Sequence, residues 1–171
     1  MQHFRTKLVA QLHDEGTLTI SVKRSDLVHD SYASISGLDA TTLVRRLAIK
    51  FEGESGLDYG GMSREWFLEL SEALFLDTNL KLFVQNDAHN YMINPEAGDD
   101  EETLTYYFFV GTVLGMAVYH GKMFYSYFVP TFYKSLLDIK MTFDDLASLD
   151  ADIHRSMKQI AEMTDVESLD L

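Results

Sequence analysis

The chain has 171 residues, 46% of them hydrophobic, which suits one well-packed domain and argues against wholesale disorder. Its formal net charge of −13 argues against nucleic acid and against an anionic membrane surface as partners. It contains no cysteine, which excludes disulfides, thiolate metal sites and a cysteine nucleophile within these residues.

The first third of the chain predicts helices and strands in alternation. Residues 3–13 carry apolar side chains on one helical face, and Gly16 ends that helix. Strict alternation then predicts a half-buried strand over Thr17–Val22. Ser25 or Asp26 is expected to cap a short helix that ends at residue 35. Asp39 or Thr41 is expected to cap a further turn through residue 46, and a strand follows to residue 51.

A glycine-rich turn separates this strand from the next helix, because glycine permits the positive φ angles that sharp turns require. The helix is predicted over residues 63–75, with Trp66 and Phe67 on its apolar face. Residues 82–84 and 91–93 flank a polar segment and predict a hairpin, followed by a loop over residues 94–98.

Residues 103–121 form a long apolar segment without a formal charge. Together with the spacing of Gly111 and Gly115, this length suggests a membrane-spanning helix as one interpretation. The polar residues within the segment favour a buried central helix instead, with the two glycines where a neighbouring helix packs closely. The acidic run at residues 99–102 is expected at the N-terminus of this helix, where the helix dipole favours negative charge.

Three shorter helices are predicted in the C-terminal third. They cover residues 127–137, with Pro130 in the first turn, residues 142–147, and a last helix from Asp150 or Asp152 to about residue 163. Residues 166–171 are expected to be extended. In the last helix, a stripe of helical spacing predicts that Ile160 and Ala161 face the core, with Ile153 and Met157 near its edge.

No pattern of catalytic or metal-binding residues emerges from the spacing. The six histidines share no metal-ligand spacing, and no P-loop, dinucleotide-binding loop or nucleophile elbow occurs. We therefore expect no metal and no cofactor. The absence of cysteine, of an N-x-S/T sequon and of a visible signal peptide predicts a location in the cytoplasm or the nucleus. Taken alone, the residues predict a mostly helical α+β domain that serves as a binding or structural unit.

The glycine-rich turn and the helix after it resemble the HECT family of ubiquitin ligases, whose N-terminal lobe carries G-L-D-Y-G-G-x-x-R-E-W-F. The matching positions are Gly56, Asp58, Tyr59, Gly60, Gly61, Arg64, Glu65, Trp66 and Phe67. Further similar segments are residues 3–8, residues 23–32 with their D-S-Y ending, the I-N-P loop at residues 93–95, and residues 107–120. The subgroup with WW domains is the most similar.

This resemblance implies that residues 1–171 are a partial HECT domain: the large N-lobe subdomain, truncated before the small subdomain is complete, with the C-lobe absent. The family transfers ubiquitin through a C-lobe cysteine thioester to substrate lysines. By implication, this part recruits a ubiquitin-conjugating enzyme and is inactive alone. The docking positions that the resemblance implies are Ile153, Ser156, Met157, Leu169 and Leu171.

The sequence departs from the family pattern at two places. Residues 77–83 lack the aromatic pair with which the family binds a second, regulatory ubiquitin, so no ubiquitin binding is expected there. Thr112 replaces an arginine that is common in the central helix. The alternative function is a non-catalytic protein-interaction domain that retains the N-lobe fold; a cysteine-bearing C-lobe in the full-length gene product would distinguish the two.

Overall fold

The computed structural model describes residues 16–54, 60–76 and 80–163. The chain divides into two compact units, the first made of residues 1–82 and 95–125 and the second of residues 83–94 and 126–171. Among the described residues, each unit combines helices with one two-stranded sheet. The predicted α+β class with mostly helical content is therefore confirmed.

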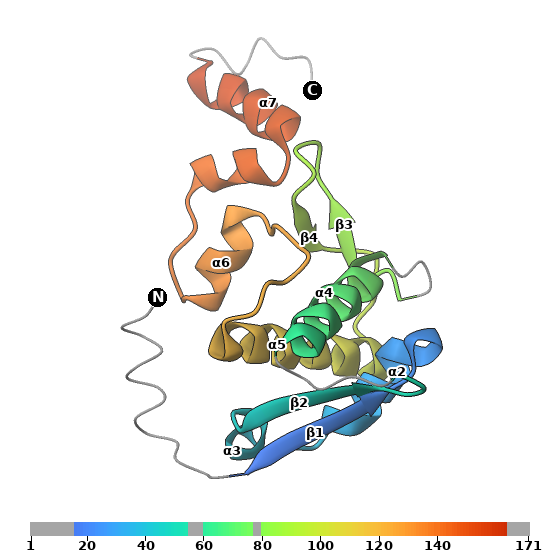
Figure 1. The fold of residues 1–171 in the computed structure, drawn as a ribbon. Helices are drawn as coiled ribbons and strands as arrows, with labels where there is room; N and C mark the ends of the chain where they lie inside the picture. The colour runs from blue at the N-terminus through green and yellow to red at the C-terminus, as the bar shows by residue number, and fades with distance from the viewer. Residues whose placement is uncertain (1–15, 55–59, 77–79, 164–171) are drawn as a thin grey trace. The chain divides into compact units, whose positions relative to one another are not determined.

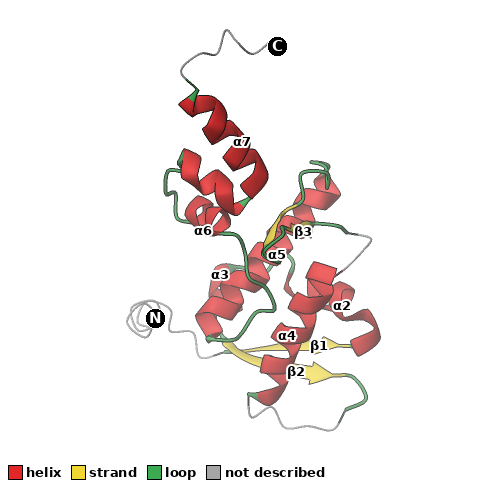
Figure 2. Cartoon of the chain, turned by 90° about the horizontal axis from the view of Figure 1, so that it is seen from above, coloured by secondary structure: helices red, strands yellow, loops and turns green. Residues whose placement is uncertain are grey.

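The first unit starts with a strand–helix–strand arrangement, visible in both views (Figures 1 and 2). Strand β1 (Thr17–Val22) pairs in parallel with β2 (Arg46–Phe51), in a register that runs from Thr17 opposite Arg46 to Val22 opposite Phe51. The connection contains a 3-10 turn (Arg24–Asp26) and helices α2 (Leu27–Ile35) and α3 (Ala40–Leu43). Parallel strands require such a crossover, because a tight hairpin joins only antiparallel strands.

Two longer helices complete the first unit. Helix α4 (Gly61–Leu76) packs against β2 and α2, and it also contacts α5 (Glu101–His120). The residues that alternate inward along the strands are buried with the apolar faces of both helices. This core includes Ile20, Val22, Ile49, Phe51, Trp66, Phe67, Leu70, Leu74 and Val113.

For helix α5, the structure confirms one part of the sequence-based prediction and contradicts another. The Asp100 side chain caps its N-terminus by accepting a hydrogen bond from the Thr103 backbone N–H, and Glu101 and Glu102 lie in its first turn. The expected close packing at Gly111 and Gly115 is wrong, since a Cβ added to either glycine would meet no atom within 4 Å. Over the described ranges, none of the helices is long and apolar enough to cross a membrane.

Three boundaries in the first half also differ from the prediction. Asp26 occupies the N-cap position of α2 but makes no capping hydrogen bond with its side chain. The turn capped by Asp39 ends at Leu43 rather than at Arg46, because Arg46 begins the strand β2 and pairs with Thr17. The helix predicted from residue 63 begins two residues earlier, at Gly61.

The second unit is built on the predicted hairpin. Strands β3 (Phe83–Gln85) and β4 (Tyr91–Ile93) pair antiparallel. In the connecting turn, the Asn86 side chain accepts hydrogen bonds from the backbone N–H groups of Ala88 and Asn90. Its amide also donates to the Ser148 carbonyl at 2.7 Å, so one asparagine ties the hairpin to the region before the last helix.

Two helices and a 3-10 segment follow in the second unit: α6 (Pro130–Leu136), a 3-10 helix (Phe143–Ser148) and α7 (Ala151–Glu162). Helix α6 begins at Pro130, not at residue 127, because the preceding backbone pairs with β4. The Tyr91 N–H donates to the Tyr127 carbonyl at 2.7 Å, and the Val129 N–H donates to the Tyr91 carbonyl at 2.9 Å. The short helix predicted at residues 142–147 is a 3-10 helix closed by a Thr142–Asp145 capping box.

Candidate functional site

The segment that resembles the family signature begins helix α4. Gly60 has a φ of +88°, a left-handed conformation that glycine adopts without a steric penalty. Gly61 is the first residue of α4. Gly56, Asp58 and Tyr59 lie outside the described residues. The turn thus sets the start of a helix, and the signature side chains that follow are placed by that helix.

Trp66 of the signature is part of the scaffold. It is fully buried, and its ring contacts Phe67 edge to face with centroids 4.7 Å apart. Its indole N–H donates a hydrogen bond to the Ser31 hydroxyl at 2.9 Å, and Ser31 is fully buried as well. Ser31 belongs to the D-S-Y segment on α2, so two separate sequence segments that resemble the family meet in this hydrogen bond.

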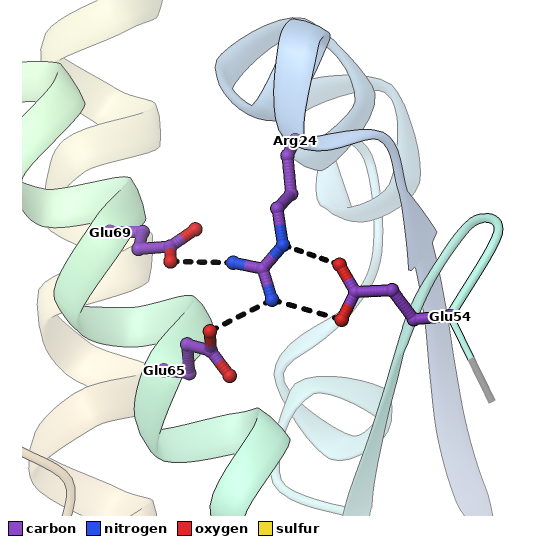
Figure 3. Close-up of polar contacts among 4 residues, drawn as sticks. All are labelled: Arg24, Glu54, Glu65 and Glu69. Atoms are coloured by element: carbon purple, nitrogen blue, oxygen red, sulfur yellow. Dashed lines mark hydrogen bonds and ion pairs between the residues drawn. The ribbon is translucent and has the colours of Figure 1, made fainter. Parts of the chain in front are cut away.

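A second contact between segments that resemble the family is centred on Arg24 (Figure 3). Its guanidinium binds Glu54 with two nitrogens, Glu65 at 2.8 Å and also Glu69, both on α4. It also stacks over the Phe51 ring, 4.0 Å from the centroid. A planar guanidinium with several donors suits this arrangement, in which one cation serves three carboxylates.

The electrostatics of this cluster favour the ionised forms of Arg24 and Glu54. The hydrogen bond from Arg24 holds the pKa of the Glu54 carboxyl below its usual value. The same bond is the main reason that the pKa of Arg24 lies above its ordinary range. The three carboxylates are held by one guanidinium, and the four charges join the end of β1, the end of β2 and helix α4.

Sequence reasoning did not assign this role to Arg24, although a signal existed. Arg24 follows the first predicted strand and Glu54 follows the second. Because parallel strands end at the same edge of a sheet, residues just after them are neighbours. That inference required the two strands to be recognised as parallel partners.

The predicted docking positions on α7 are exposed. Ile153 and Met157 are 51% and 48% exposed, and Ser156 is exposed too. Leu169 and Leu171 lie outside the described residues. The Asp150 side chain caps this helix by accepting hydrogen bonds from the backbone N–H groups of Asp152 and Ile153.

The expectation that Ile160 and Ala161 face the core is wrong. Ile160 is 51% exposed, and Ala161 is exposed as well. The half-buried residue of α7 is His154, whose ring lies 4.9 Å from that of Phe143 on the neighbouring 3-10 helix. Helix α7 therefore packs through His154 and presents an apolar stripe outward, formed by Ile153, Met157 and Ile160 and continued by Met163 just after the helix.

An apolar stripe of this kind fits protein binding rather than chemistry. Three large apolar side chains about half exposed on one helix, with a fourth just after its end, are typical of a protein interaction surface. Within the described part of the chain, no group of three histidine, cysteine, aspartate or glutamate side chains is placed to hold a metal ion.

Comparison with known proteins places these features in a family. The model of the HECT-domain (ubiquitin-transferase) family matches residues 68–171. The E3 ubiquitin-protein ligase pub1 of Schizosaccharomyces pombe is 41% identical over 98% of this chain and 23% of its own length. The E3 ubiquitin-protein ligase NEDD4 of Mus musculus is 39% identical over 99% of this chain and 19% of its own length.

A third relative, the E3 ubiquitin-protein ligase RSP5 of Chaetomium thermophilum, is 43% identical over 84% of this chain and 18% of its own length. The chain thus spans about a fifth of the length of these curated relatives. The family match covers more than half of the chain. Segments that resemble the family meet in the buried Trp66–Ser31 hydrogen bond and in the exposed Arg24 cluster. The chain therefore belongs to the HECT-domain (ubiquitin-transferase) family.

Proposed function

We propose that residues 1–171 are the N-lobe part of a HECT ubiquitin-protein ligase and that α7 forms part of its docking surface for a ubiquitin-conjugating enzyme. The observation that carries this proposal is the outward apolar stripe on α7, which includes two of the positions that the resemblance implies, Ile153 and Met157. Family membership supplies the chemical context. Interfaces of this type rely on a few apolar anchors surrounded by polar residues, as Ile153 and Met157 are surrounded here.

The chain's own contribution would be positioning rather than bond chemistry. It has no cysteine, so the thioester step of the family requires a cysteine from outside these residues. In that reaction, the cysteine thiolate attacks the thioester of the conjugating enzyme, whose thiolate leaves. A substrate lysine amine then attacks the new thioester, forms an amide with loss of a proton and releases the cysteine thiolate. The docking surface would hold the conjugating enzyme close to the cysteine, which raises its effective concentration.

Binding of purified ubiquitin-conjugating enzymes tests this proposal, measured by NMR titration of this chain and of a version extended by about 80 residues, toward a typical domain size. Met157→Asp places a charge in the stripe, and we expect it to weaken binding at least ~10-fold, as loss of an anchor residue does. Its thermal unfolding should be unchanged, because Met157 is half exposed.

Gln159→Asp is the matched control. It adds the same charge to the same helix at an exposed position, about 200° around the helix axis from Met157. We expect this variant to bind like the original chain. Equal weakening by both variants would show a general charge effect and not a docking stripe. If neither chain length binds any conjugating enzyme, the alternative of a non-catalytic interaction domain replaces the proposal.

A further inference from the structure

A second apolar surface lies in the first unit, between α5 and the connection from α2 to α3. It is a cavity of about 330 Å³. Its walls are largely apolar and include Ile35, Leu38, Ala40, Leu43, Phe108 and Phe109. A cavity of this size accommodates apolar side chains, and one with few polar groups favours an apolar ligand.

One wall of this cavity is an unusually exposed aromatic side chain. Phe108 is 78% exposed, and Leu104, one helical turn before it, is 54% exposed. Neither packs into the core of the first unit. Phenylalanine carries a large apolar surface, and leaving it in water costs free energy that a partner would recover.

The same face of α5 continues past Phe108 to Gly111 and Gly115, both open to solvent. The spacing between residues 104, 108, 111 and 115 places them in one row on a helix. From residue 104 to residue 115 the row rises 11 steps of about 1.5 Å each, which is about 16 Å. Without Cβ atoms at Gly111 and Gly115, the backbone of a second helix can approach α5 closely.

Negative charge surrounds one end of this row. Asp99 and Glu101 line a shallow depression together with Leu104 and Phe108, and Glu102 lines another beside Tyr32. Among the residues that the structure describes, no lysine or arginine lines the cavity or either depression. A partner with basic residues beside its apolar side chains complements this charge. A second copy of the chain does not, because it would bring the same carboxylates and a net charge of −13.

We infer that this surface, here called the α5 groove (the cavity together with residues 99–115 of α5 and its N-terminal flank), binds an amphipathic helix of a partner protein. About three helical turns of that partner would lie along α5, with its apolar side chains against Phe108 and in the cavity. Its lysine or arginine residues would lie beside Asp99, Glu101 and Glu102. The groove belongs to the first unit and uses no residue of the α7 stripe.

A model peptide tests this inference directly. The probe is an 18-residue peptide with leucines on one helical face and lysines elsewhere, titrated into the ¹⁵N-labelled chain. We expect amide shifts concentrated in residues 32–43 and 99–115, and affinity that falls as salt increases. A peptide of the same pattern with glutamate in place of lysine should bind at least ~10-fold more weakly.

Two matched pairs of variants separate specific binding from general attraction to an acidic protein. Phe108→Ser should weaken binding of the lysine-containing peptide at least ~10-fold, as loss of a central aromatic anchor does. Leu76→Ser, at an exposed apolar position at the end of α4 that lines neither the cavity nor the two depressions, should not. Glu101→Gln with Glu102→Gln should weaken binding more than Glu72→Gln with Asp87→Asn, which removes the same charge elsewhere. Thermal unfolding of each variant verifies the fold.

Three results would overturn the inference. The first is equal weakening within either pair of variants, which would indicate non-specific attraction. The second is self-association that Phe108→Ser abolishes, seen by sedimentation, which would make the groove a contact between copies. The third is peptide binding that appears only after residues 1–15 are deleted, which would assign the groove to the chain's own N-terminal segment.

Discussion

The hydrogen bond between Trp66 and Ser31 offers the sharpest test of how this scaffold is held together. Both residues are fully buried, and the indole N–H donates to the hydroxyl at 2.9 Å. Ser31→Ala removes the acceptor and leaves a buried N–H without a partner. An unsatisfied buried donor costs about 1–3 kcal/mol of the free energy of unfolding.

The reverse variant, Trp66→Phe, removes the donor and also leaves a cavity next to the hydroxyl. Its cost should exceed that of Ser31→Ala, because each cubic ångström of cavity adds about 24 cal/mol. The double variant should lose less free energy of unfolding than the sum of the two single variants. It removes both the donor and the acceptor, so no buried polar group is left unpaired. We expect a coupling free energy of about 1 kcal/mol or more, as for residues in direct contact.

Urea unfolding followed by circular dichroism measures all four proteins with one signal. With a slope of about 2 kcal/mol/M, a loss of about 2 kcal/mol lowers the midpoint by roughly 1 M. Trp66 is the only tryptophan, so its fluorescence separately reports the first unit in the two proteins that retain it. A Ser31→Ala midpoint within error of the original, or additive costs in the double variant, would refute the reasoning.

Three further predictions concern backbone and charge. Gly111→Ala should raise the free energy of unfolding by about 0.5–1 kcal/mol, because alanine favours the helix and an added Cβ meets no neighbour. Gly60→Ala should lower it by more than about 1 kcal/mol, since its φ is +88°, whereas Gly61→Ala should change it little. Urea unfolding measures the free energy of unfolding of these three glycine variants. Lys134→Met should raise the pKa of Asp145, which Lys134 and the Thr142 N–H now hold below its usual value. Carboxyl ¹³C NMR measures that pKa.

The last change has a consequence for acid stability. Because the pKa of Asp145 is lower in the folded chain than in the unfolded one, its contribution is present above the unfolded pKa and is lost as pH falls through the folded pKa. Lys134→Met should therefore reduce the loss of stability on acidification. An unchanged Asp145 pKa would contradict the role of the ion pair, and destabilisation by Gly111→Ala would contradict the open face of α5.

Local patterns in the sequence determined most of the elements. Alternating apolar residues predicted β1 with its observed bounds, and Asp39 and Asp150 cap helices as expected. The acidic run expected at the N-terminus of the central helix supplies its cap, Asp100. These features depend on neighbours only a few residues away, so the sequence contains all the information that they need. The signature around Trp66 likewise identified the family without a structure.

Only the tertiary structure decided which distant residues meet and which apolar faces stay open. Arg24 reaches Glu65 across 41 positions, and Ser31 reaches Trp66 across 35. No periodicity encodes such pairs, because they depend on how the strand pair and α4 pack. Periodicity found the stripe with Ile160 but not whether another element covers it, since hydrophobic spacing defines a face and only packing determines its exposure.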